Sequence, residues 1–174
     1  MESVASYASH KAYELRIDSQ VGEDEPDEIR AVFAHWDQVR GSRDMPRRAE
    51  LDIIGCTPTA AGNVFLVDVH AAAPRFVLRL VGTKVQTRLG LTKGDSIEAL
   101  DAGCEMASIV EQYERTVADR RPTLCVHSWV RLNGKPIDYR RLLLPLGEYG
   151  QVETLLGCVV FGKWDKVRPK RRIL

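Results

Sequence analysis

Five residues in two regions of the chain have side chains that could hold a small molecule. A guanidinium group carries a planar fork of donors that fits a carboxylate or a phosphate. Aromatic side chains can clamp a planar ligand between their faces. We therefore expect ligand-binding residues in the first region at Arg79, and in the second region at His127, Trp129, Tyr139 and Arg141.

Each of these residues also has a simpler interpretation. Strand alternation places Arg79 on the face opposite Phe76, Leu78 and Leu80. If the arginine face points outward, Arg79 covers the N-terminal helix and does not enter a pocket. The later aromatic and cationic residues could equally form a dimer interface or the surface on which the first helix packs. Spacing alone leaves these alternatives open.

Catalytic chemistry has little support in the sequence. There is no Gly-x-Ser-x-Gly elbow, P-loop, dinucleotide glycine fingerprint or His-Glu-x-x-His helix. A small enzyme that uses Asp68, His70 or His127 as a general base remains an alternative. We predict that the protein is not an enzyme.

The overall charge gives no reason to expect nucleic acid as a partner. The chain has 174 residues, with 25 lysines and arginines against 24 acidic residues. Any attraction to phosphate must therefore be local. The basic tail 163–174 is interpreted as a solvated segment, with sequence-blind phosphate binding and an electrostatic dock for an acidic partner as the alternatives. Reduced thiols are predicted at four widely spaced cysteines: Cys56, Cys104, Cys125 and Cys158.

The N-terminus lacks the pattern of a signal peptide, and no run approaches the roughly 20 apolar residues that span a bilayer. We therefore expect a cytoplasmic protein with no membrane insertion.

An amphipathic helix is predicted to begin near Pro26, because proline fits a first helical turn and acidic residues follow it. Its apolar stripe consists of Ile29, Val32, Phe33 and Trp36 at helical spacing. The stripe must pack on the outer face of a sheet or on a second subunit. We treat these four residues as candidate interface residues.

The rest of the chain is predicted to form two strands, then several helices, then three more strands. Strands are expected at 64–69, 75–81, 123–132, 137–146 and 152–161, with a hairpin turn at Asn133-Gly134. Between the second and third strands we expect three helices. The first is short, is capped by Thr83 and ends at Gly90, and the second has an Asp95/Glu98 capping box and ends at Gly103. The third is longer, and its apolar positions are Met106, Ile109, Val110, Tyr113 and Val117.

This order predicts an α+β fold with a five-stranded antiparallel sheet, short helices across one face and an N-terminal amphipathic helix. The predicted organisation is a flexible leader at 1–25, one domain at 26–162 and the basic tail at 163–174.

Several motifs in one order give the chain a family resemblance. "HWDQVRGSRDMPRRAELD", "FLVDV" with "RFVLRLVGTKV", "GLTKGDSI" and "DYRRLLLPLGEYGQVETLLG" together cover roughly residues 33 to 161. They resemble a family of short, single-domain PAS proteins found widely in alphaproteobacteria. The resemblance implies a PAS fold and a sensory or regulatory role, and it leaves the ligand unnamed because fold and function are separate inferences.

The resemblance also implies partners and raises the question of a cofactor. A PAS regulator would act through protein contacts, as a homodimer or with a two-component protein such as a histidine kinase. A flavin photoreceptor of the light-oxygen-voltage type needs an Asn-Cys-Arg motif, which residues 90–100 lack. A haem sensor needs an axial ligand, for which His127 is the best candidate. The cofactor is therefore left unknown, and a ligand-free adaptor is the second interpretation.

Overall fold

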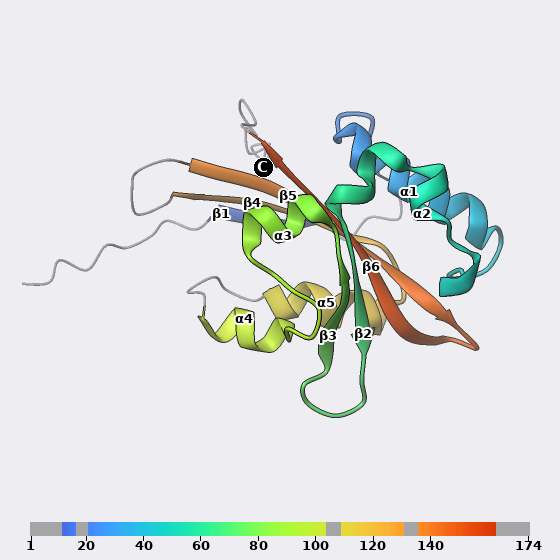
Figure 1. Ribbon diagram of the computed structural model, residues 1–174. Coiled ribbons are helices and arrows are strands. Elements are labelled where there is room, and N and C mark those ends of the chain that lie inside the picture. The colour runs from blue at the N-terminus through green and yellow to red at the C-terminus, as the bar shows by residue number, and fades with distance from the viewer. Residues whose placement is uncertain (1–11, 17–20, 104–108, 131–135, 163–174) are drawn as a thin grey trace, which may run out of the picture.

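The computed structural model describes residues 12–16, 21–103, 109–130 and 136–162, and its centre is a single antiparallel sheet (Figure 1). The strands are β1 (Ala12–Arg16), β2 (Val64–Val69), β3 (Phe76–Val81), β4 (Thr123–Val130), β5 (Pro136–Glu148) and β6 (Gln151–Gly162). Their order across the sheet is β1-β4-β5-β6-β2-β3.

The five predicted strands are confirmed, and β1 is an additional strand. It pairs with β4 at one edge of the sheet, within the segment that the sequence pattern had assigned to a leader. The predicted turn at Asn133-Gly134 lies outside the described residues.

Helices cover both faces of this sheet (Figure 1). The outer group consists of α1 (Asp27–Arg40), the 3-10 turn η1 (Arg48–Glu50), α2 (Ile53–Cys56) and the 3-10 turn η2 (Pro58–Asn63). The inner group consists of α3 (Thr83–Leu89), α4 (Ile97–Gly103) and α5 (Ile109–Asp119). The inner helices lie between β3 and β4 in sequence, as predicted, and Met106 lies outside the described residues.

Helix α1 packs its apolar stripe onto the outer face of the protein's own sheet. Ile29, Val32 and Trp36 are fully buried there, and Phe33 is half-buried at the margin. The Trp36 indole N–H donates a hydrogen bond of 2.9 Å to the carbonyl oxygen of Pro145 in β5. The sequence left open whether the stripe packs on the sheet or on a second subunit. It packs on the sheet, which already covers these side chains.

A buried ion pair joins the start of α1 to the centre of the sheet. The Glu25 carboxylate, just before the helix, accepts a hydrogen bond from the Arg140 guanidinium on β5. Both side chains are almost completely buried. Because breaking a buried pair leaves a charge without its partner, this contact helps to fix where α1 begins on the sheet.

The turn between β3 and α3 depends on close packing at Gly82. Its φ of −66° is open to any residue, so a special backbone conformation is not the reason for glycine here. A Cβ atom would instead lie 2.6 to 2.8 Å from the carbonyl oxygens of Gly62, Val64 and Ala61. Thr83, predicted as the cap, is the first helical residue, with Gly82 at the cap position.

The predicted capping box of α4 is wrong. The cap hydrogen bond comes from Ser96, whose hydroxyl oxygen accepts from the Ala99 N–H at 3.1 Å. The Asp95 carboxylate accepts from the Thr92 N–H at 2.8 Å. The Glu98 carboxylate accepts from the Phe76 N–H at 3.0 Å and so ties α4 to β3. Glu98 serves the edge strand and not its own helix.

A bulge in β3 breaks the predicted alternation. Leu66 pairs with Leu80 and Val67 pairs with Leu78, which leaves Arg79 as the extra residue. Leu78 is buried under the inner helices, whereas Leu80 is 43% exposed. The prediction that Leu80 shares a face with Leu78 is therefore wrong.

Candidate functional site

An apolar cavity lies between the inner face of the sheet and helices α3, α4 and α5. Its volume is about 170 Å³. The sheet contributes Phe65, Leu78, Tyr139, Arg141 and Val159, and the helical layer contributes Val85, Leu89, Leu91, Ile97, Leu100, Ile109 and Tyr113. A cavity of this size and lining can hold one small molecule, because an apolar cavity of about 150 Å³ accepts a benzene ring.

Arg141 is the one charged side chain among the described residues of this wall. It is 5% exposed, and its Nε donates a hydrogen bond of 2.7 Å to Oε1 of Gln112 on α5. Its guanidinium lies 5.5 Å from the ring centre of Tyr113 and 5.9 Å from that of Tyr139. The Nη2 atom is buried and has no hydrogen-bond partner in the described part of the chain.

Tyr113 and Arg141 each stay in one protonation state near neutral pH. Burial raises the pKa of Tyr113 to about 12. Burial alone would lower the pKa of Arg141, but Tyr139, Tyr113 and Cys125 outweigh it and hold that pKa above its ordinary value. The cavity therefore presents a permanent cation and a neutral phenol.

The cavity brings together two of the five predicted ligand-binding residues, Tyr139 and Arg141. In the register of β4 and β5, His127 is the partner of Tyr139, and Trp129 is the partner of Ile137. The side chains of His127 and Trp129 lie outside the described part of the structure.

Arg79 has a different environment. Its side chain is 45% exposed and forms an ion pair of 2.9 Å with Asp68 on β2. Arg79 is not among the residues that line the cavity. Its position corresponds to the outward interpretation that the sequence had left open. Asp68 is held by this pair, and His70 is exposed beyond the end of β2, so neither candidate base faces the cavity.

Gln112 is a site residue that the sequence reasoning missed. Its amide nitrogen donates to the carbonyl oxygens of Thr123 at 3.2 Å and Arg141 at 3.0 Å, while its amide oxygen receives the Arg141 Nε–H. This amide holds the arginine side chain and fastens α5 to two strands. A buried glutamine between the apolar positions Ile109 and Tyr113 was the available signal.

Gly157 shapes the floor of the cavity. It is the cross-strand partner of Phe65, and a Cβ atom at this position would lie 2.0 Å from the tip of the Phe65 ring. The ring can therefore lie flat over β6 only because residue 157 has no side chain. This arrangement keeps the aromatic ring in the wall and out of the cavity space.

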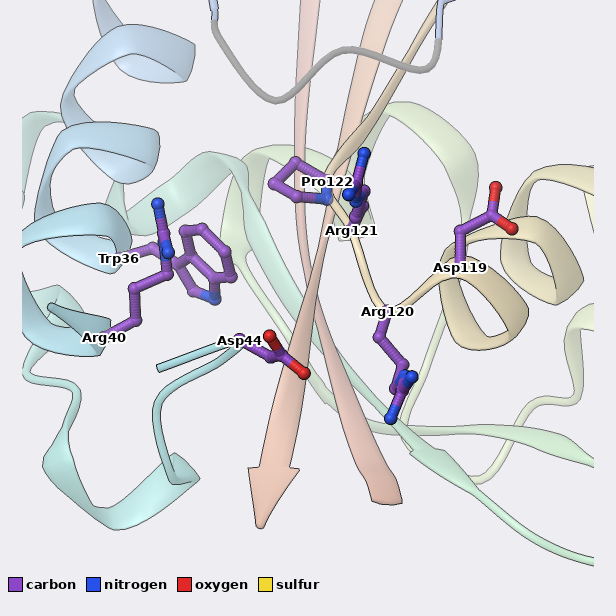
Figure 2. Close-up of a pocket in the computed structure, with 7 residues that line it drawn as sticks. All are labelled: Trp36, Arg40, Asp44, Asp119, Arg120, Arg121 and Pro122. Carbon is purple, nitrogen blue, oxygen red and sulfur yellow. The ribbon is translucent and has the colours of Figure 1, made fainter. Parts of the chain in front are cut away.

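A second, polar cleft opens near the C-terminal end of α1. Its volume is about 370 Å³, and it lies between that helix and the turn that joins α5 to β4. Figure 2 shows that its side chains do not converge, because those of Arg40 and Arg120 point in opposite directions. Arg40 pairs with Asp37, and Asp119 pairs with Arg115. The charged side chains of the cleft thus do not converge on one position where a ligand could bind.

The described residues contain no group of three histidine, cysteine or acidic side chains placed to hold a metal ion. No helix among them has the length and apolar character needed to cross a bilayer.

Comparison with known proteins identifies the family. The family model described as PAS domain matches residues 25–160. The chain belongs to the PAS domain family, whose members are sensory and regulatory modules. No curated protein matches the sequence.

Solved structures with a similar fold include light-oxygen-voltage proteins. One, from a study of the light-oxygen-voltage mechanism with a flavin analogue, is 17% identical over 64% of this chain and 84% of its own, with a TM-score of 0.48. The Rhodobacter sphaeroides LOV protein is 22% identical over 60% and 62%, with a TM-score of 0.44. An RNA-binding light-oxygen-voltage receptor is 15% identical over 88% of this chain and 39% of its own, with a TM-score of 0.50. At these identities the likeness concerns the fold alone.

Proposed function

We propose that this protein is a cytoplasmic PAS sensor that acts through protein–protein contacts and whose state is set by a small molecule in the apolar cavity. The observation that carries the proposal is the cavity of about 170 Å³ beneath the inner helices. A ligand-free adaptor would be expected to fill this space with side chains, since protein interiors are close-packed.

The groups in the wall favour binding over catalysis. A general acid or base works best with a pKa near the operating pH. In this cavity the pKa of Tyr113 moves away from neutrality to about 12, and the pKa of Arg141 is also raised. These groups suit a receptor that holds a ligand without reacting with it.

The cavity also argues against a flavin of the kind implied by the light-oxygen-voltage proteins. Pockets for drug-sized ligands typically measure about 300 to 1,000 Å³. The present cavity is smaller, at about 170 Å³, and residues 90–100 contain no cysteine for a flavin adduct. We therefore propose a ligand smaller than a flavin.

The proposed output is a change in how the outer layer packs. Strand β5 contributes Arg141 to the cavity and Arg140 to the ion pair with Glu25 at the start of α1. Ligand binding that shifts β5 would therefore change how α1 packs on the sheet. A ligand that binds one of these two arrangements of α1 more tightly increases the population of that arrangement. The partner in this proposal is a second copy of the chain or a two-component protein such as a histidine kinase.

The test uses toluene as a neutral probe of the cavity. We expect toluene to raise the melting temperature of the full chain and to change amide hydrogen exchange in α1 or the mass in sedimentation. The matched control is Val85→Phe, which places a larger side chain in the wall and should abolish the response. Native mass spectrometry of the freshly purified protein would show a ligand that remains bound. A chain that does not bind toluene, or that binds it with unchanged exchange and mass, would contradict the proposed function.

A further inference from the structure

We infer that the ligand of the cavity is a small apolar monocarboxylate whose carboxylate is held by Arg141. This inference rests on the proposed function and names the ligand class of the same site. The body of the molecule would lie against the apolar wall formed by Leu78, Val85 and Ile97.

Two adjacent arginines of β5 have different surroundings. Arg140 and Arg141 lie on opposite faces of β5 and are both buried. Arg140 has the Glu25 carboxylate as its counter-ion. Among the described residues, the ionisable side chains that shift the pKa of Arg141 are Tyr139, Tyr113 and Cys125, and these include no carboxylate. A guanidinium removed from water needs an anion to offset the lost hydration.

The N–H donors of the Arg141 guanidinium are only partly used within the described part of the protein. The Nε–H of Arg141 donates to the amide oxygen of Gln112. The Tyr139 side chain makes a further hydrogen bond with the Arg141 side chain. The Nη2 atom has no partner in the described part of the protein. Because Gln112 holds Nε, the side chain is oriented before a ligand arrives. A pre-oriented guanidinium binds a carboxylate with less loss of rotamer freedom.

The size of the cavity and the charge in its wall limit the ligand. A volume of about 170 Å³ accommodates a single ring with a short chain, or an aliphatic chain of similar volume. Among the described residues that line the cavity, Arg141 is the one with a charged side chain, so these residues offer no cation to a second carboxylate. A phosphate ester has three acceptor oxygens and up to two charges, which a single guanidinium in an apolar wall does not satisfy. These limits together favour one carboxylate on an apolar body.

The experiment compares two probes of equal shape on the full chain by calorimetry. The probes are 3-phenylpropanoate and its neutral amide, 3-phenylpropanamide. We expect wild type to bind the carboxylate at least about tenfold more tightly than the amide, as for hydrogen bonds to charged groups. In Arg141→Met this preference should disappear while the amide still binds. Arg141→Lys keeps the charge without the planar fork and should retain part of the preference.

The outcomes separate this inference from the proposed function. If toluene and the amide bind to wild type but the carboxylate is not preferred, the ligand class is wrong and the cavity remains a binding site. If neither the two probes nor toluene binds, the proposed function itself fails. A preference for the carboxylate that persists in Arg141→Met would overturn the role of Arg141. Should Arg141→Met not fold, the wild-type comparison and Arg141→Lys still decide the question.

Discussion

The packing of α1 on the sheet can be tested by truncating Trp36, because the contacts of its side chain set the expected loss in the free energy of unfolding. The indole is 1% exposed, donates to the Pro145 carbonyl oxygen and lies 5.3 Å beneath the Arg40 guanidinium. Trp36→Ala should lower the free energy of unfolding by about 3 to 5 kcal/mol, the range for a large buried aromatic residue. Trp36→Phe keeps most of the ring and should lose about 1 to 3 kcal/mol, mainly because the Pro145 carbonyl is left without a donor.

The assay is urea unfolding followed by far-UV circular dichroism, which does not depend on the fluorescence of the substituted residue. In a thermal scan the loss for Trp36→Ala corresponds to about 6 to 20 °C, at about 2 to 4 °C for each kcal/mol in a domain of this size. The matched control is Ile54→Ala on α2, where the side chain is 74% exposed and the change should stay within about 0.5 kcal/mol. A loss below about 1 kcal/mol for Trp36→Ala would refute the reasoning, because α1 would then not be docked on the sheet in solution.

Three further predictions concern the sheet. Gly157→Ala should push the Phe65 ring into the cavity, so that toluene affinity falls about tenfold while stability falls by only about 1 to 3 kcal/mol; unchanged toluene binding in calorimetry would show that the ring stays in the wall. Glu25→Gln should lower the free energy of unfolding in urea by about 3 kcal/mol, because the buried Arg140 guanidinium loses its ion pair with the Glu25 carboxylate; a loss near zero would mean that the pair is not formed. Burial raises the pKa of Cys158 to about 12, whereas an unfolded thiol titrates near about 8.5, so unfolding releases a proton between these values. Stability should therefore be intact below about pH 8.5 and fall above it by up to about 1.4 kcal/mol per pH unit for this thiol, and Cys158→Val should remove that share of the slope in urea titrations at pH 8 to 10.

Strong periodicity explains why most elements could be predicted from the sequence. The spacing of Ile29, Val32 and Trp36 fits a helix with one buried face, and the structure shows that face against the sheet. Weak periodicity explains what was missed. β1 is five residues long and pairs with one neighbour only, so it carries little pattern of its own. The short α2 and its flanking 3-10 turns are likewise too brief for a repeating apolar position.

The candidate site depended on contacts that a single sequence does not contain. Alternation could place Tyr139 and Arg141 on one face of β5, and both residues line the same cavity in the structure; their role in ligand binding stays a prediction. In the sequence, Arg79 resembles Arg141, since each arginine interrupts an apolar strand. The difference arises from the bulge in β3 and from Asp68 on the neighbouring strand, which pairs with Arg79 at the surface. Neither the bulge nor the partner can be read from the spacing of Arg79.

Two adjacent arginines of β5 connect the cavity with the outer layer, since Arg141 lines the cavity and Arg140 pairs with Glu25. Adjacent strand residues point to opposite faces, so Arg140 and Arg141 necessarily enter different layers of the protein. The chain itself supplies a carboxylate for the first from Glu25, which lies 115 positions earlier in the sequence. For the second it supplies an amide and aromatic rings. Because the two side chains share one stretch of backbone, we propose that an anion bound to Arg141 also shifts Arg140, which anchors α1, and that occupancy of the cavity reaches the surface by this route.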